Sequence, residues 1–200
     1  SAAGDNATVC EGTTHQLAGQ STNCTGLLWE SSGTGTFSDA TILDPVYTPS
    51  EGDVTMGDVI LSLTAINPAT NDSTSSLTLS LVATPVVFAG DATEICDGDG
   101  YSAANATAAN YTGMEWISSG TGVFDDPTSV TPRYTPSAED IAAGNVSLTL
   151  RAWNDVCAPV ESVVPITIRP LPTPTIAGLN QLCINQTGIE YTAATTTNTY

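Results

Sequence analysis

The chain has 200 residues, of which 12% are charged, and 21 acidic residues against three arginines give it a net charge of −18. Such a surface repels nucleic-acid phosphates and anionic lipid headgroups, so we expect binding neither to nucleic acid nor to a membrane surface. No apolar run approaches the roughly 18 residues that a membrane-spanning helix needs, so we also expect no membrane insertion.

The sequence contains an internal repeat. Residues 29–50 and 116–137 are identical at 14 of 22 positions. Cys10, Cys96 and Cys183 recur with almost the same period, at spacings of 86 and 87 residues. The chain is therefore expected to be a tandem array of similar domains. The predicted domains are residues 1–85, residues 86–170 and, as an incomplete third domain, residues 171–200.

Each repeat begins with a tryptophan strand and a glycine-rich turn. In the first repeat Trp29 is expected in the core, and the Ser-Ser-Gly-Thr-Gly segment after it suits a turn with positive φ. Ser50 and Asp53 then form a Ser-x-x-Asp helix-capping pattern, and Gly57 is placed to end a helix after one turn. The corresponding residues of the second repeat are Trp116, Ser137, Asp140 and Gly144.

Two longer strands complete each repeat. Apolar residues alternate with polar ones over residues 59–65 and 146–152, a pattern typical of a strand buried on one face. Residues 77–81 and 164–168 show a similar alternation. Several short strands, one helical turn and a buried tryptophan predict an all-β fold, with tandem immunoglobulin-like β-sandwich domains joined by short linkers.

The chain has five cysteines, an odd number, and the alignment of the repeats suggests two pairs and one unpaired cysteine. Cys96 is expected to pair with Cys157 inside the second domain, and Cys10 with Cys24 inside the first. Cys183 would then need a partner beyond residue 200. Metal ligation is the alternative, and the absence of a C-x-x-C motif disfavours it. Disulfides indicate an oxidising, extracellular location.

The link between the repeats, residues 83–89, holds a proline and an apolar run. It predicts limited hinge freedom, with Phe88 wedged between the domains. Trp153 falls on the outward phase of its strand, so it is either exposed and adhesive or packed against the neighbouring domain.

Catalytic patterns are weak. His15 is the only histidine, and the sequence has no G-x-S-x-G motif. The adjacent carboxylates at 125–126 and 139–140 should point in different directions, which disfavours a glycosidase pair. We therefore expect neither an enzyme nor a cofactor.

Asp97 and Asp99 form the strongest metal candidate, because Asp-Gly-Asp-Gly resembles a flexible calcium loop that Asp91 or Glu94 could complete. The alternative is an acidic turn beside Cys96. The loop lacks the terminal glutamate of an EF-hand, and the first repeat has a different sequence there.

The combination of W-x-S-S-G-T-G-x-F, Y-T-P-S and G-x-V-x-L-x-L with an early and a late cysteine resembles repeats of very large surface proteins of Bacteroidetes. These include gliding-motility adhesins of the SprB type. Residues 171–200 are similar to the opening of a polycystic-kidney-disease (PKD) repeat. The resemblance implies type IX secretion, a cell-surface or extracellular location and a rod-like adhesin or filament segment.

The expected function is therefore a non-enzymatic stalk segment. Its partners would be neighbouring repeats of the same chain and an extracellular polysaccharide or surface ligand. Two alternatives stay open: a pilus-like subunit that donates a strand from residues 171–200, and a carbohydrate-binding module of a secreted enzyme.

Overall fold

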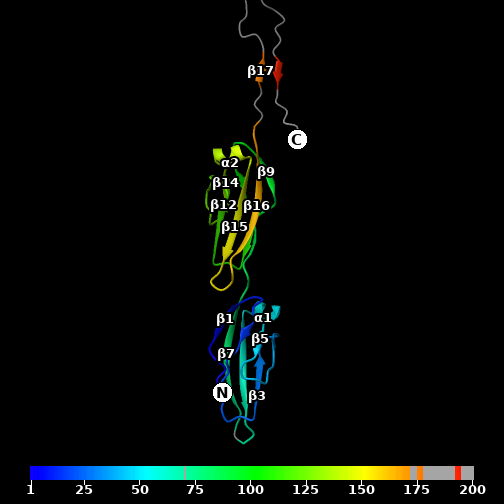
Figure 1. Ribbon diagram of the computed structural model, residues 1–200, viewed down its shortest axis with the longest axis vertical. Coiled ribbons are helices and arrows are strands. Elements are labelled where there is room, and N and C mark those ends of the chain that lie inside the picture. The colour runs from blue at the N-terminus through cyan, green and yellow to red at the C-terminus, as the bar shows by residue number, and fades with distance from the viewer. Residues whose placement is uncertain (70, 172–174, 178–191, 195–200) are drawn as a thin grey trace, which may run out of the picture.

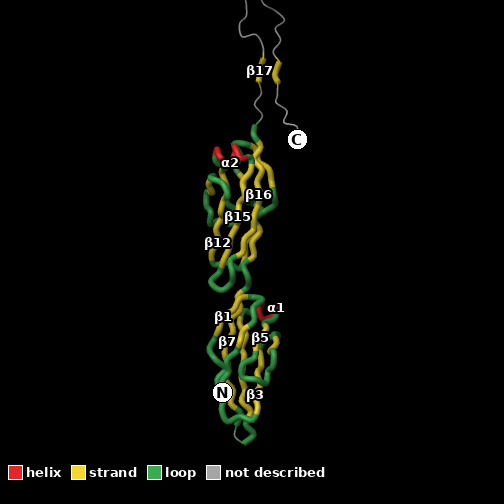
Figure 2. The backbone as a smooth tube through the Cα atoms, in the orientation of Figure 1, coloured by secondary structure: helices red, strands yellow, loops and turns green. Residues whose placement is uncertain are grey.

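The computed structural model describes residues 1–200 apart from residues 70, 172–174, 178–191 and 195–200. Two β-sandwiches are stacked end to end along the longest axis of the molecule (Figure 1). The fold is all-β with short helices, which confirms the predicted class (Figure 2). Elements of the first domain are β1 (Ala7–Cys10), β2 (His15–Gln16), β3 (Gly26–Ser31), β4 (Thr36–Phe37), β5 (Val46–Thr48), α1 (Glu51–Met56), β6 (Asp58–Ile66) and β7 (Ser73–Val82).

The second domain repeats this order and adds two short strands that pair with each other. Its elements are β8 (Val86–Phe88), β9 (Thr93–Cys96), β10 (Tyr101–Ser102), β11 (Thr107–Ala109), β12 (Gly113–Ser118), β13 (Val123–Phe124), β14 (Arg133–Thr135), α2 (Ala138–Ala143), β15 (Asn145–Trp153) and β16 (Val160–Arg169). Two further strands, β17 (Thr175–Ala177) and β18 (Thr192–Ala194), pair with each other. Most of the predicted third domain lies outside the described residues.

The two main sheets have the same topology in both domains, and the second domain adds the two-stranded sheet β11-β8. The larger sheets have the orders β1-β7-β6-β3 and β9-β16-β15-β12, and the smaller sheets β2-β5-β4 and β10-β14-β13. The first strand of each larger sheet runs parallel to its neighbour, whereas the other pairs of those sheets are antiparallel. In consequence β1 ends beside the end of β7, and β9 ends beside the end of β16.

The alternation predicted for the long strands is confirmed. In β6 the side chains of Val59, Leu61 and Leu63 are buried, and in β15 those of Leu148 and Leu150 are buried. Burial of alternate residues on one face of each larger sheet provides most of the apolar surface of each core.

An aromatic row joins the two sheets of each sandwich. Trp29 is 2% exposed, and its indole N–H donates to the carbonyl of Ile42 at 3.1 Å. Its ring centroid lies 6.1 Å from that of Phe37, which in turn lies 5.0 Å from that of Tyr47. Trp116 is 4% exposed and stands at the head of the equivalent row in the second domain. Both tryptophans are core residues of their domains.

The short helices begin and end where the capping pattern places them. Ser50 caps α1 and Ser137 caps α2, each in a full capping box with the aspartate three residues later. Gly144 follows α2 with a φ of 74°, in the left-handed region that favours glycine. The local prediction for these segments is confirmed.

Phe88 does not form the wedge that the sequence suggested. It lies in β8, which pairs with β11 of the second domain, and 41% of its surface is exposed. The next residue, Ala89, donates its N–H to the Ser162 hydroxyl at 3.0 Å, which fixes β8 to the second sandwich. The linker is therefore incorporated into the second domain soon after Pro85, and other residues fill the junction.

Candidate functional site

A disulfide joins the two domains. Cys10, the last residue of β1, is bonded to Cys157 in the loop between β15 and β16. Their Cα atoms are 5.1 Å apart although 147 residues separate them in sequence. The predicted pairings of Cys10 with Cys24 and of Cys96 with Cys157 are therefore wrong. Cys24 and Cys96 are free thiols.

The physical reason is that the expected partners lie at opposite ends of each sandwich. Cys96 pairs in register with Arg169 at the end of β16, whereas Cys157 precedes the start of that strand. A strand of ten residues spans roughly 30 Å. Disulfide Cα atoms lie within about 7 Å of each other. Cys183 lies outside the described residues.

The same separation holds in the first domain. Cys10 lies beside Val82 at the end of β7. Cys24 precedes Thr25, whose N–H donates to Ile66 at the far end of the sheet, where β6 ends. We call the end that carries Cys10 or Cys96 the distal end of its domain, and the opposite end the base. The junction brings the base of the second domain onto the distal end of the first (Figure 1).

Asn154 fastens this base to the first domain. Its side-chain N–H groups donate to the carbonyls of Ala83 at 3.2 Å and Asn110 at 3.1 Å. Its side-chain oxygen accepts from the N–H groups of Val156 at 3.1 Å and Cys157 at 2.6 Å. One asparagine, 9% exposed, thus shapes the loop that carries the cysteine and also binds the neighbouring domain.

A second asparagine adds to the junction. The Asn110 amide donates to the Thr84 carbonyl at 3.2 Å, and the Asn110 backbone has a φ of 58°. The sulfur of Cys157 lies 3.5 Å from the Val82 carbonyl oxygen. The acceptors on the first domain are thus backbone carbonyls. Both asparagines recur in the repeat, as Asn67 and Asn23 of the first domain.

A buried carboxylate organises the glycine-rich turn in each domain. Asp53 is fully buried and accepts from the N–H groups of Thr34 at 2.7 Å, Gly35 at 3.0 Å and Ser50 at 3.1 Å. It also accepts from the Tyr47 hydroxyl at 2.7 Å. Four donors around one carboxylate satisfy a group whose burial would otherwise be costly.

These contacts set the ionisation of the pair. Burial alone would raise the pKa of Asp53, but the donors from Thr34, Tyr47 and Ser50 outweigh it and lower the pKa of this carboxyl. Burial raises the pKa of Tyr47 to about 12, and the adjacent Asp53 carboxylate adds to that rise. The pair is a carboxylate beside a neutral phenol at neutral pH.

The second domain has the same arrangement around Asp140. Its carboxylate accepts from the Tyr134 hydroxyl at 2.7 Å and from the N–H groups of Thr121 at 3.0 Å, Gly122 at 2.9 Å and Ser137 at 3.0 Å. Burial opposes ionisation, and the hydrogen bonds outweigh it, so the pKa of Asp140 is lowered. Because the arrangement recurs at equivalent positions in both cores, we assign it to folding.

The glycines of this turn are required for a reason other than the positive φ that the sequence predicts. None of Gly33, Gly35, Gly120 and Gly122 has a positive φ. A Cβ on Gly33 would collide with the Asp53 carboxylate, and one on Gly120 with that of Asp140. The turn therefore needs glycine because the carboxylate approaches the backbone closely.

The remaining catalytic candidates have structural roles. His15 pairs with Tyr47 in the smaller sheet, and burial lowers its pKa. Asp125 accepts from the backbone N–H of Arg133 at 2.8 Å, and Asp126 from the Thr128 hydroxyl at 2.7 Å. These acids stabilise turns, as expected for solvated loop carboxylates.

The calcium candidates lie in a tight turn after β9. Asp97 donates its N–H to the Arg169 carbonyl at 2.8 Å, and Asp99 donates to the Cys96 carbonyl at 3.0 Å. The Glu94 carboxylate, a suggested helper, contacts the Arg169 guanidinium at 2.7 Å. Within the described part of the chain, no three His, Cys, Asp or Glu side chains converge on a potential metal position.

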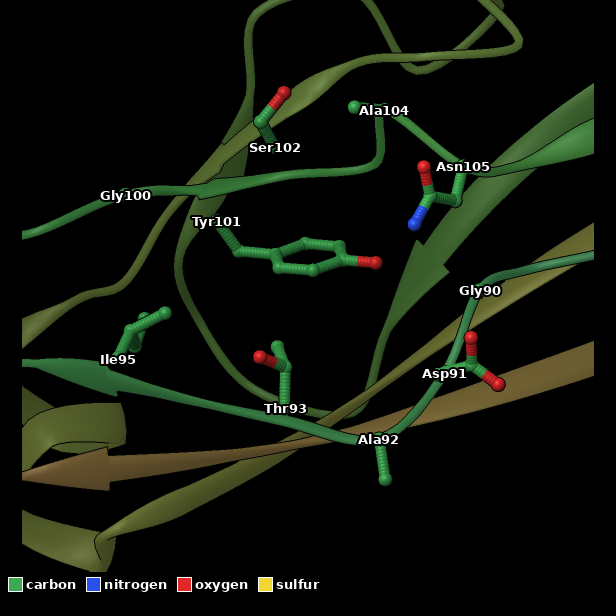
Figure 3. Close-up of a pocket in the computed structure, with 10 residues that line it drawn as sticks. All are labelled: Gly90, Asp91, Ala92, Thr93, Ile95, Gly100, Tyr101, Ser102, Ala104 and Asn105. Carbon is green, nitrogen blue, oxygen red and sulfur yellow. The ribbon is translucent and has the colours of Figure 1, made fainter.

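A shallow hollow of about 270 Å³ lies beside β9 and β10. Figure 3 shows the Tyr101 ring lying across it, between Thr93 and Asn105. The Tyr101 hydroxyl donates to Ala89 at 3.5 Å, and burial, together with the negative charge of Asp91, raises its pKa. The first domain has His15 at the position of Tyr101, so the tyrosine of this hollow is not repeated there.

Trp153 packs within its own domain. Its ring lies so close over Gly113, on the neighbouring strand, that a Cβ there would collide with the indole. Arg151 reaches Glu115 at 3.7 Å and Glu161 at 3.5 Å on the same sheet. The sequence predicts a Trp153 that is either exposed and adhesive or packed against the neighbouring domain, whereas the contact found here is with Gly113 of its own domain.

The fold and the junction define a tandem immunoglobulin-like β-sandwich protein whose domains are cross-linked by a disulfide. No protein-family model matches the sequence, and no curated protein is significantly similar to it. Among the described residues, no helix is both long and apolar enough to cross a membrane.

Solved structures of tandem β-sandwich domains are similar to the chain. Sidekick-1 immunoglobulin domains 1–5 match 96% of this chain and 44% of theirs, with a TM-score of 0.51 and 12% identity. Human CDH23 EC21-23 matches 96% of this chain and 83% of its own length, with a TM-score of 0.50 and 12% identity. Protocadherin Gamma B2 extracellular cadherin domains 3-6 match 96% and 54%, with a TM-score of 0.50 and 13% identity. The chain spans about half the length of the first and third, and such low identity defines the fold alone.

Proposed function

We propose that the chain is a non-enzymatic segment of an extracellular rod, in which the domains set length and stiffness. The observation that carries the proposal is the junction, where the Cys10–Cys157 disulfide and the amide of Asn154 hold two sandwiches end to end. A disulfide of this kind persists in oxidising surroundings, which supports an extracellular or cell-surface location.

The arrangement of polar groups supports a structural role. Asp53 and Asp140, the buried carboxylates among the residues that the structure describes, are both satisfied by turn donors and a tyrosine of their own domain. The exposed acids hold turns or give the surface its charge of −18, which favours solubility. Repetition of one sandwich then supplies reach, with each junction restricting the angle to the next domain.

Small-angle X-ray scattering of the full chain tests the proposal. A compact globule of this length would have a radius of gyration of about 16 Å. We expect a clearly larger value and a cross-section equal to that of one sandwich. A matched sample with Cys24→Ser, which removes a free thiol away from the junction, should scatter identically. A compact particle under oxidising conditions would contradict the rod.

At a finer level, we propose that this rod belongs to a giant cell-surface adhesin of the gliding-motility type, exported by type IX secretion. The repeat motifs quoted above support this assignment. An antibody to residues 1–170 should detect, on surface fractions, a protease-sensitive band of very high mass that survives boiling with reductant. A ladder of small multiples that collapses on boiling would instead favour a non-covalent, pilus-like polymer.

A further inference from the structure

The second domain has a distal end built like the one that is occupied in the first. Cys10 is the last residue of β1 beside Val82, and Cys96 is the last residue of β9 beside Arg169. The residue after each cysteine donates its N–H across this pair at 2.8 Å, to the carbonyl of Val82 in one domain and of Arg169 in the other.

The turns that follow the two cysteines also match. Thr13 donates to the Cys10 carbonyl at 3.1 Å, and Asp99 donates to the Cys96 carbonyl at 3.0 Å. Gly12 and Gly98 take positive φ values of 76° and 89° at equivalent positions. Cys96 is therefore presented by the same backbone as Cys10, and it is exposed with a free thiol.

The loop that carries Cys157 occupies the distal end of the first domain, and contacts within the second domain largely preform this loop. Asn154 accepts from Val156 and Cys157 within one loop, so this loop holds its shape without help from the first domain. Across the junction, Asn154 and Asn110 donate to the carbonyls of Ala83 and Thr84. Backbone carbonyls are available at any sequence, including the corresponding residues 170–171 of the second domain.

We propose that the distal end of the second domain is a docking face for the base of another domain of this same type, closed by a disulfide from Cys96 to a cysteine at the position of Cys157. The inference rests on the proposed rod and extends it, because one junction geometry would then propagate along the chain. Formation of the bond oxidises two thiols to one disulfide. The two electrons and two protons pass to a small-molecule disulfide, which becomes two thiols.

The experiment inserts a second copy of residues 84–170 after residue 170 of the full chain, which repeats the natural Thr84-Pro85 link at the new junction. In the inserted copy Cys96 is changed to Ser, so that the remaining Cys96 belongs to the original second domain. The protein is refolded with oxidised and reduced glutathione, free thiols are alkylated in denaturant, and non-reduced peptides are analysed by mass spectrometry.

We expect two linked peptide pairs in the same molecule, Cys10–Cys157 and Cys96–Cys157, with Cys24 fully alkylated as an internal control. The matched control carries Cys157→Ser in the inserted copy. It should keep the first pair and leave Cys96 alkylated. A second format, with residues 171–172 at the new junction, guards against a strained link.

Alkylated Cys96 in both formats, with the inserted domain resistant to protease and the Cys10 pair intact, would overturn the inference while leaving the proposed rod in place. Should the inserted domain be cleaved by protease in both formats, the distal end does not accept a domain of this type, which also overturns it. Loss of the Cys10 pair from the unmodified chain would instead contradict the proposed function itself.

Discussion

Cys10 and Cys157 lie in different domains, and their Cα atoms are 5.1 Å apart. The relationship depends on the polarity of the sandwich, because β1 runs parallel to β7 and carries Cys10 to the end where the first domain stops. The loop between β15 and β16 faces back toward that end (Figure 1). One cysteine on each of the two domain ends that face each other is thus sufficient to join the domains.

Removing this disulfide should loosen the junction without unfolding either domain. In Cys10→Ser/Cys157→Ser the covalent linker and the hydrogen bonds of Asn154 and Asn110 remain. Each of these hydrogen bonds contributes about 1 kcal/mol. We expect scattering curves that require a broad range of interdomain angles, whereas far-ultraviolet circular dichroism stays unchanged. Cys96→Ser is the control and should scatter like the parent. Identical curves for the double variant and the parent would show that the disulfide does not restrict the angle.

The glycine-rich turn should tolerate no side chain at Gly120. Its Cβ would displace the Asp140 carboxylate, so Gly120→Ala is expected to destabilise the second domain by roughly 2–3 kcal/mol, as overpacking does. Gly26→Ala is the control, because the nearest atom to its Cβ would be 3.6 Å away. Denaturant unfolding should show a lower midpoint for the first variant and little change for the second. Equal midpoints would mean that the turn adjusts easily.

Replacing the buried carboxylate itself should have a similar effect. In Asp140→Asn one acceptor oxygen becomes an N–H₂ group that faces donors such as Gly122, so we expect a loss of roughly 2–4 kcal/mol in the second domain. The exposed Asp99→Asn should change stability by less than about 0.5 kcal/mol. Thermal unfolding with a separate probe for each domain makes the comparison. A stability loss shared equally by both domains would contradict the local role.

Acid should destabilise both domains through Asp53 and Asp140. Their folded pKa values are lowered, so the unfolded chain binds more protons, and stability rises with pH. The stabilisation is complete above the unfolded aspartate value of about 3.9 and is lost as pH falls through the lowered folded values. The free energy of unfolding, measured from about pH 7 down to about pH 2, should therefore decrease as the pH is lowered below about 4. In Asp140→Asn the fall for the second domain should be smaller, and an unchanged pH profile would assign it to other acids.

Local features could be predicted from the sequence because their causes lie within a few residues. The Ser50 and Ser137 caps depend on contacts three residues apart, and the alternation in β6 and β15 follows from the two faces of a strand. The repeat also indicated that any feature of one core should recur in the other. The Trp29 and Trp116 indoles each donate to a carbonyl 13 residues later.

The sequence predicts only part of what the two buried aspartates do. Asp53 was expected to cap a helix, and it does, but its contacts with Thr34 and Tyr47 join segments that only the folded sandwich brings together. The sequence therefore predicts positive φ at the glycines before these aspartates, whereas in the structure the close approach of a carboxylate excludes a side chain there.

By itself, therefore, the sequence determined the β-sandwich class and the helix caps, because alternation and capping are short-range patterns. The tertiary structure decided which cysteines meet. Cys10 and Cys96 lie at distal ends and Cys24 and Cys157 at bases. A disulfide forms only between Cα atoms that the chain topology brings within about 7 Å, whatever their spacing in sequence.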